Sequence, residues 1–166
     1  MRATRAGLIF LAAAAAAMAQ RPAQQNQPPK TFSSAADIQA MIEKAKAEHK
    51  PNQALISQRI LHLQPYNVNL EYRASVGPAA VHEREAEIFY VIDGSATLTT
   101  GGKLTNERRT NAANLTGSGI EGGTSRMVSK GDFIVVPENT PHWFSKIDGT
   151  VVLMTLHVPR PVPGAR

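Results

Sequence analysis

Two histidines and one glutamate stand out because together their side chains could hold a metal ion. His82 and Glu87 lie in one segment with four residues between them, and His142 lies in a second segment. Two imidazoles and one carboxylate can form a facial set of ligands with open positions, the arrangement that non-haem Fe(II) uses. Imidazole also suits Zn, Cu and Ni, and a carboxylate suits Mn, so the spacing does not select the metal. The alternative is a metal-free pocket in which the histidines only form hydrogen bonds.

Other histidines are weaker candidates for the same chemistry. His157 and His62 lie in predicted strands and could each add a ligand, although a lone histidine is more often a satisfied core or surface residue. His49, at the end of a predicted helix, is expected to be solvated. Two aromatic residues near the candidate ligands, Tyr90 and Trp143, are expected to pack in the fold. Two acidic residues, Glu83 and Glu85, are expected to be surface charges.

The absence of cysteine excludes several kinds of functional site. The chain contains no cysteine, which excludes disulfides, thiolate metal sites and cysteine nucleophiles. This composition suits an oxidising compartment, where a free thiol would be a liability.

The candidate ligands must be held in place by secondary structure, which the short apolar runs of the sequence predict. The 12 glycines and 11 prolines end many of the runs, which favours short strands over long helices. The predicted strands cover residues 55–63, 68–74, 88–92, 96–100, 133–136, 143–147 and 151–158. Asp93-Gly94 and Asp148-Gly149 are dipeptides typical of hairpin turns. The pattern predicts a β-sandwich or β-barrel.

The strand after Glu87 is apolar on both of its faces. One face carries Glu87, Phe89 and Val91, and the other carries Ile88, Tyr90 and Ile92. Such a strand is expected to be covered on both sides, by the barrel interior and by a helix or a second subunit. A regular strand would point His82 away from Glu87, so we expect a turn or bulge in residues 83–86 to bring them together.

A single helix is predicted over residues 33–50. Ser34 and Asp37 resemble an N-terminal capping pattern, and Pro51 disfavours helix in the residue before it. The apolar residues fall at helical spacing on one face: Ile38, Met41, Ile42 and Ala45. This face must lie on the barrel or on a partner subunit.

The alternating pattern lapses over residues 101–129, which we expect to form one long loop. Loops of this length are usually disordered or functional. Because this one separates the two segments that carry the candidate ligands, a functional role is favoured.

The N-terminus has the three parts of a secretion signal. Arg2 and Arg5 precede an apolar run over residues 7–18, and Ala17-Met18-Ala19 supplies a cleavage pattern. The run of about twelve residues is shorter than the roughly twenty that a membrane span needs. We therefore expect a signal peptide at 1–19, a flexible leader at 20–32 and a periplasmic or secreted mature protein without a membrane span.

Length and charge exclude some classes of protein. The 166 residues suffice for one domain, and 42% of them are hydrophobic, as expected for a packed fold. The net charge is +5, but the basic residues are scattered, so nucleic-acid binding has little support.

The two segments with the candidate ligands resemble the two motifs of the cupin superfamily. His82, Glu87 and Gly94 fit the first motif, and Gly131, Pro137 and His142 fit the second. The chain departs from the motifs at three positions: Ala80 replaces a histidine, Asn139 a glycine and Lys146 an asparagine. The resemblance covers residues 54–158 and leaves a tail at 159–166.

The resemblance implies an all-β fold, a cupin double-stranded β-helix (jelly-roll) barrel with one N-terminal α-helix. It also implies a divalent transition metal (Fe, Mn, Zn, Ni or Cu) at His82, Glu87 and His142, and a homodimer. The expected function is that of an exported metal-dependent enzyme acting on a small molecule, of oxygenase, isomerase or lyase type. The alternatives are a non-catalytic small-ligand or sugar-binding cupin, or a stress or storage protein stabilised by metal.

Overall fold

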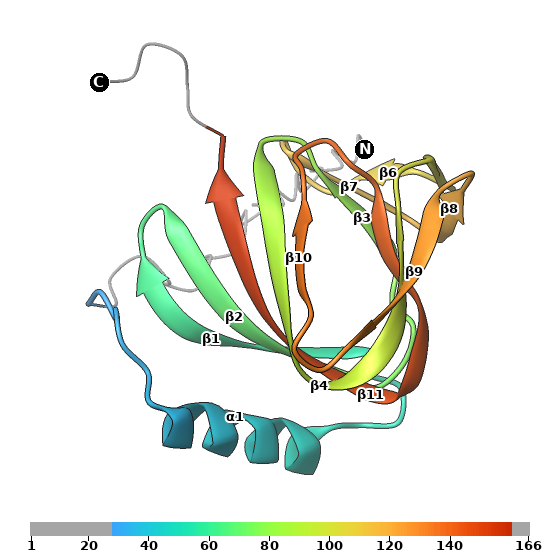
Figure 1. Cartoon of the computed structure of the whole chain (residues 1–166). Helices are drawn as coiled ribbons and strands as arrows, with labels where there is room; N and C mark the ends of the chain where they lie inside the picture. Colours follow the sequence, from blue (N-terminus) through green and yellow to red (C-terminus); the bar gives the residue numbers. More distant parts are fainter. Residues whose placement is uncertain (1–27, 161–166) are drawn as a thin grey trace, which may run out of the picture.

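The computed structural model describes residues 28–160, so the predicted signal peptide, residues 20–27 of the leader and residues 161–166 of the tail lie outside it. The described part is mostly β-strand with one helix, which confirms the predicted all-β class. Figure 1 shows the helix α1 (Ala35–Glu48) beneath the sheet. The strands are β1 (Leu55–Leu63), β2 (Tyr66–Arg73), β3 (Ala79–His82), β4 (Glu85–Thr100), β5 (Lys103–Thr105), β6 (Arg108–Arg109), β7 (Asn114–Gly117), β8 (Gly119–Glu121), β9 (Thr124–Ser129), β10 (Phe133–Val136) and β11 (His142–Pro159).

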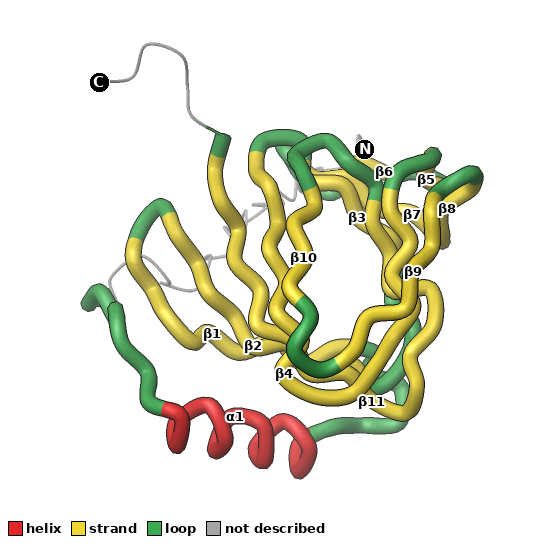
Figure 2. Tube along the Cα trace, in the orientation of Figure 1, coloured by secondary structure: helices red, strands yellow, loops and turns green. Residues whose placement is uncertain are grey.

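Two long strands organise the barrel. β4 and β11 pair antiparallel along almost their full length. β11 also pairs with β2 and β3, and β4 also pairs with β9 and β10, so the sheet curves around a common interior (Figure 2). β1 extends the sheet beyond β2, β7 and β6 extend it beyond β3, and β5 and β8 form a separate two-stranded sheet.

The two predicted hairpin turns are wrong, because both dipeptides lie inside continuous strands. Ser95 pairs with Asp148 and Gly94 pairs with Val151, which leaves Gly149 and Thr150 as a bulge in β11. Gly94 has a φ of 80°, and a Cβ atom there would lie 2.0 Å from the carbonyl oxygen of Thr150. Asp-Gly therefore allows a bend between paired strands here rather than a chain reversal.

The barrel interior is filled by apolar side chains from β4, β9, β10 and β11. On β4 the inward residues alternate with outward ones, as predicted: Phe89 and Val91 are fully buried inside, and Ile92 packs on the helix side. The buried core consists of Phe89, Val91, Ala96, Leu98, Val128, Val136, Phe144, Val151 and Leu153.

The helix packs its apolar side on the outer face of the sheet. Ser34 and Asp37 form a reciprocal capping box at its N-terminus, which confirms the predicted start. Ile42 and Ala45 are buried in a second apolar cluster with β1 and β2 residues such as Leu70. The prediction that His49 is solvated is wrong: its side chain is partly buried, and Nε2 lies 2.8 Å from the carbonyl oxygen of Gln53.

The segment 101–129 holds the strands β5 to β9 instead of one long loop. β7 pairs with β3, and β9 pairs with the second half of β4. These strands are short, and β9 is largely exposed, so no alternation of apolar residues marks them in the sequence. The end of the predicted leader is also paired, since the backbones of Lys30 and His62 exchange hydrogen bonds of 2.8 and 2.9 Å.

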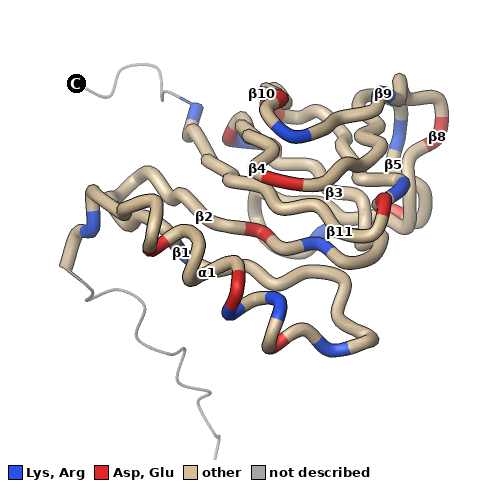
Figure 3. The backbone as a smooth tube through the Cα atoms, turned by 60° about the horizontal axis from the view of Figure 1, so that its bottom comes forward, with Lys and Arg blue, Asp and Glu red and all other residues tan. Residues whose placement is uncertain are grey.

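Charged residues of both signs are spread along the described part of the chain. Figure 3 shows Lys and Arg interspersed with Asp and Glu along the chain. No helix within residues 28–160 is long and apolar enough to cross a membrane.

Candidate metal site

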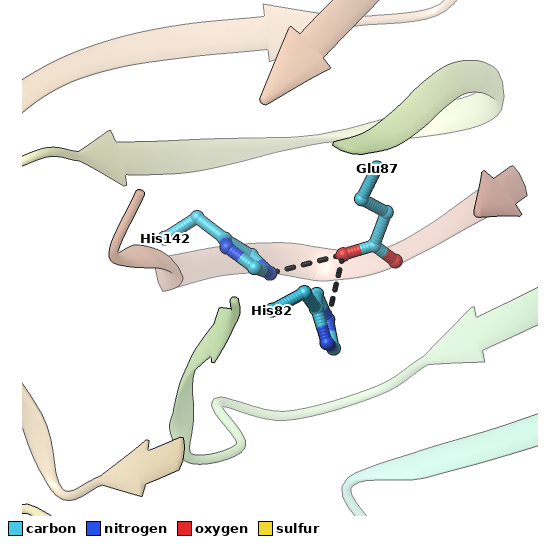
Figure 4. Close-up of side chains that lie close together, drawn as sticks. All are labelled: His82, Glu87 and His142. Carbon is cyan, nitrogen blue, oxygen red and sulfur yellow. Dashed lines mark ion pairs between the residues drawn. The ribbon is translucent and has the colours of Figure 1, made fainter. Parts of the chain in front are cut away.

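The three predicted ligands come from three strands and meet at one end of the barrel interior. His82 ends β3, Glu87 lies near the start of β4, and His142 begins β11. Nε2 of His142 lies 3.0 Å and Nε2 of His82 lies 3.2 Å from the same carboxylate oxygen, Oε2 of Glu87 (Figure 4). The bend at Glu83 and Arg84 separates β3 from β4 and brings His82 beside Glu87, as predicted.

The carboxylate at the centre is buried and ionised. Glu87 and His142 are only 4% and 6% exposed. Burial by itself raises the pKa of Glu87, but hydrogen bonds from His142 and His82, with the charges of His142 and His157, outweigh it and hold the pKa well below its usual range. A deprotonated oxygen is the form that binds a metal.

Both predicted histidine ligands are oriented by oxygen acceptors behind them. Nδ1 of His82 lies 2.9 Å from Oδ1 of Asn114, and Nδ1 of His142 lies 3.1 Å from the carbonyl oxygen of Thr140. Burial by itself lowers the pKa of His82, but hydrogen bonds to Glu87 and Asn114 and the nearby carboxylate charges raise it above its ordinary value. Each of these two rings therefore faces an oxygen at both of its nitrogens, and Nε2 is the nitrogen that faces Glu87.

Two further side chains join the site, one of them contrary to prediction. Glu85 was expected to be a surface charge, but its carboxylate lies 2.8 Å from Nδ1 of His157. His157 in turn places Nε2 3.4 Å from Oε1 of Glu87. Side chains alternate between the two faces of a strand, so His157 shares a face with the buried Leu153. This alternation along residues 151–157 is the feature of the sequence that places His157 toward the interior.

The other candidates lie elsewhere. His62 approaches Arg59 at 3.1 Å, outside the site, so it adds no ligand there. Glu83 pairs with Arg109, whose guanidinium holds the pKa of Glu83 below its usual value. Trp143 packs as predicted and donates a hydrogen bond of 2.9 Å to the carbonyl oxygen of Gly77.

A cavity of about 250 Å³ opens beside the site. His82, Glu87, His142 and His157 line it, together with Ala80 and an ion pair between Glu71 and Arg73. Nε and Nη2 of Arg73 donate to Oε2 of Glu71 at 2.9 and 2.7 Å, and the guanidinium lies 4.8 Å above the ring of Phe144. A larger, more open hollow lies near the end of α1, but it contains none of the candidate ligands.

The donor set fits a divalent transition metal. Within residues 28–160, two groups each offer three ligand atoms within 4.8 Å of one another: His82, Glu87 and His142, and His82, Glu85 and His157. Imidazole nitrogens with one carboxylate suit several first-row metals. The departure at Asn139 fits the fold, since this residue has a φ of 57°, where glycine and asparagine are favoured.

Solved structures that the chain resembles come from several bacteria. The chain resembles the DMSP lyase DddQ from Ruegeria pomeroyi (15% identity, 84% of this chain, 70% of that chain, TM-score 0.51). It also resembles TT1209 from Thermus thermophilus (15% identity, 72% and 95% of the chains, TM-score 0.50) and KdgF from a Halomonas species (19% identity, 68% and 86%, TM-score 0.49). No curated protein sequence matches the chain. The sequence pattern of the cupin family matches residues 52–158, which contain both motifs, and the chain therefore belongs to the cupin family.

Proposed function

We propose that this chain is an exported single-domain cupin that holds one divalent transition metal and acts as a metal-dependent enzyme on a small molecule. One observation carries the proposal: the ligand atoms of His82, Glu87 and His142 lie within 4.8 Å of one another at the wall of a cavity. At about 250 Å³ the cavity suits a small substrate rather than a polymer.

The residues around the site have separate tasks in this proposal. His82, Glu87 and His142 would hold the metal, which when bound supplies a Lewis acid that polarises a substrate oxygen. The Glu71–Arg73 pair gives the cavity a polar wall for orienting the substrate. Phe89 and Phe144 close the interior below the site and exclude water from it.

Metal analysis of protein purified without a histidine tag tests the metal site. We expect about one transition-metal ion per chain, and a calorimetric titration of the metal-free protein should give micromolar or tighter binding. His62→Ala is the matched control, because His62 lies outside the site. A parent protein that binds no transition metal at micromolar concentration would contradict the proposal.

A non-catalytic ligand-binding cupin is the second candidate, favoured by Ala80 at the position of a family histidine. The two functions differ in turnover. Substrates found by thermal-shift screening of the metal-loaded protein should be consumed if the chain is an enzyme. Ligands that stabilise the protein and are recovered unchanged would support the binding function instead.

Export and assembly are further parts of the proposal. Intact-mass measurement of the exported protein should give a chain that begins at Gln20, and retention of residues 1–19 would contradict export.

A homodimer is supported by exposed apolar residues on the outer face of β10, since Phe133 and Val135 are 65% and 56% exposed. Light scattering should give a dimer for the parent and a monomer for Phe133→Asp. A monomeric parent would contradict the assembly.

A further inference from the structure

His157 occupies a position in the sheet that points its side chain at Glu87. In the pairing of β11 with β4, His157 lies directly opposite Glu87. Residues directly opposite each other in an antiparallel pair share one face of the sheet. The preceding facing pairs, Thr155 with Phe89 and Leu153 with Val91, are fully buried in the interior. His157 is therefore held at the interior end of β11 by the same register that buries the core.

Three imidazoles surround the carboxylate of Glu87 in the same manner. Nε2 of His142 and Nε2 of His82 lie 3.0 and 3.2 Å from Oε2. Nε2 of His157 lies 3.4 Å from Oε1, the other oxygen of the same carboxylate. Neighbouring ligand atoms of one metal ion stand at about this separation when each metal–ligand distance is about 2.0–2.2 Å.

The opposite nitrogen of each ring faces an oxygen. Asn114 Oδ1 lies behind His82 at 2.9 Å and the Thr140 carbonyl behind His142 at 3.1 Å. Behind His157 the Glu85 carboxylate lies 2.8 Å from Nδ1, a buried atom that forms no hydrogen bond of good geometry in this structure. Metal-bound histidines in proteins almost always have such an oxygen behind the ring, because it fixes the tautomer and the ring orientation.

The hydrogen bonds around Glu87 mark a place where a cation can bind. Nε2 of His142 and Nε2 of His82 donate to the Glu87 carboxylate here, and a bound cation would take the place of those protons, because metal ligands are deprotonated. His82 belongs to both groups of three ligand atoms that lie within 4.8 Å of one another, the group with Glu87 and His142 and the group with Glu85 and His157. A cation bound beside His82 would therefore also lie near His157.

Position 80 explains why a ligand from β11 is needed. Ala80 stands where the family motif has a histidine, and it lies opposite His142 in the pairing of β3 with β11. Its methyl group lines the cavity and offers no ligand atom. We propose that His157 is a fourth metal ligand, oriented by Glu85, that supplies from β11 the imidazole missing at position 80. The inference rests on the metal site proposed above and adds a ligand to it.

Copper(II) gives a readout that does not depend on activity. The full mature protein is loaded with one equivalent of Cu²⁺, and pulsed electron paramagnetic resonance counts the coordinated imidazoles. We expect three in the parent, two in His157→Gln and three in the matched control His62→Gln. The count in the parent needs no substitution, so it holds even if a variant fails to fold.

Affinity provides the second measurement. Zn²⁺ titration should show binding by His157→Gln weakened at least about 100-fold, since even an outer partner of a metal ligand is worth about 10–100-fold. Glu85→Gln should weaken binding by about 10-fold and keep three coordinated imidazoles, as a positioning residue would. Thermal unfolding of each metal-free variant checks that the fold is retained.

The outcomes separate this inference from the metal site itself. Two imidazoles in the parent, with unchanged zinc affinity in His157→Gln, would overturn the role of His157 and leave the three-ligand site intact. A parent that binds neither Cu²⁺ nor Zn²⁺ at micromolar concentration would overturn both proposals.

Discussion

The same two strands build an apolar core at one end of the barrel and a polar site at the other. Successive inward pairs of β4 and β11 are Val91 with Leu153, Phe89 with Thr155, and Glu87 with His157. The first pair is wholly apolar, the second mixed, and the third consists of ionisable groups. Backbone register therefore fixes which side chains meet, and only the residue types decide whether a layer stabilises the fold or performs chemistry.

The two ends should respond differently to substitution. Removing a core side chain costs transfer free energy and leaves a cavity, so it acts on folding. Removing a site side chain takes away a ligand atom, so it acts mainly on metal affinity.

Phe89→Ala should have the largest effect on stability. Phe89 is fully buried, and its ring packs edge-on against Phe144 at 5.4 Å. Truncation should lower the free energy of unfolding by about 3–5 kcal/mol, measured by chemical denaturation of the metal-free protein. Met127→Ala on the exposed strand β9 is the control and should change it by less than about 0.5 kcal/mol. A loss below about 1 kcal/mol for Phe89→Ala would mean that this end is not the principal core.

Glu87→Gln should affect metal binding far more than folding. The change keeps the size of the side chain and removes its negative charge. Metal affinity should fall at least about 100-fold in calorimetry, more than the 10–100-fold expected for an outer partner. Glu83→Gln is a matched control, because Glu83 pairs with Arg109 outside the site. Equal affinities for Glu87→Gln and parent would remove Glu87 from the ligand set.

The pH dependence of stability should reverse when metal is added. The folded pKa of His82 is raised above its ordinary value of about 6.5. In metal-free protein its contribution to the free energy of unfolding is therefore complete below about pH 6.5 and is lost as pH rises through the folded pKa. Metal binding needs deprotonated histidines, so its contribution grows with pH. Melting temperatures between about pH 5 and pH 8, with chelator and with Zn²⁺, measure both slopes. Parallel slopes would contradict metal binding by His82.

Asn114→Ala should have the smallest of these effects. It removes the acceptor behind His82 without removing a ligand, and affinity should fall by about 10-fold. Asn114→Asp keeps an oxygen at that position and should retain most of the affinity. If both variants bind like the parent, the orientation of His82 is set by packing alone.

Much of the fold follows from local sequence signals. The motif residues His82, Glu87 and His142 meet as predicted, and the helix begins directly after its N-cap Ser34 because the capping pattern is local. Asp93-Gly94 and Asp148-Gly149 misled the strand prediction, because a dipeptide that permits a hairpin also permits a bulge between paired strands.

Other parts of the site depend on pairing across distant strands. Glu85 enters the site only because β4 and β11 align His157 with Glu87, a register that no local pattern encodes. Asn114 lies in a strand of four residues within a polar segment, so its contact with His82 had no signal in periodicity. The sequence did not indicate which residues of distant strands lie next to each other, and this pairing decides which side chains enter the site.

The position of β11 in chain order has a consequence for how the site is made. This strand, the last within residues 28–160, carries both His142 and His157 and pairs with β2, β3 and β4. A chain that emerges from the ribosome cannot assemble the ligand set until β11 has been synthesised and docked between strands made much earlier. Such non-local pairing is slow to form. Metal loading should therefore be a late event in biogenesis, and fragments that end before β11 should fail to retain metal.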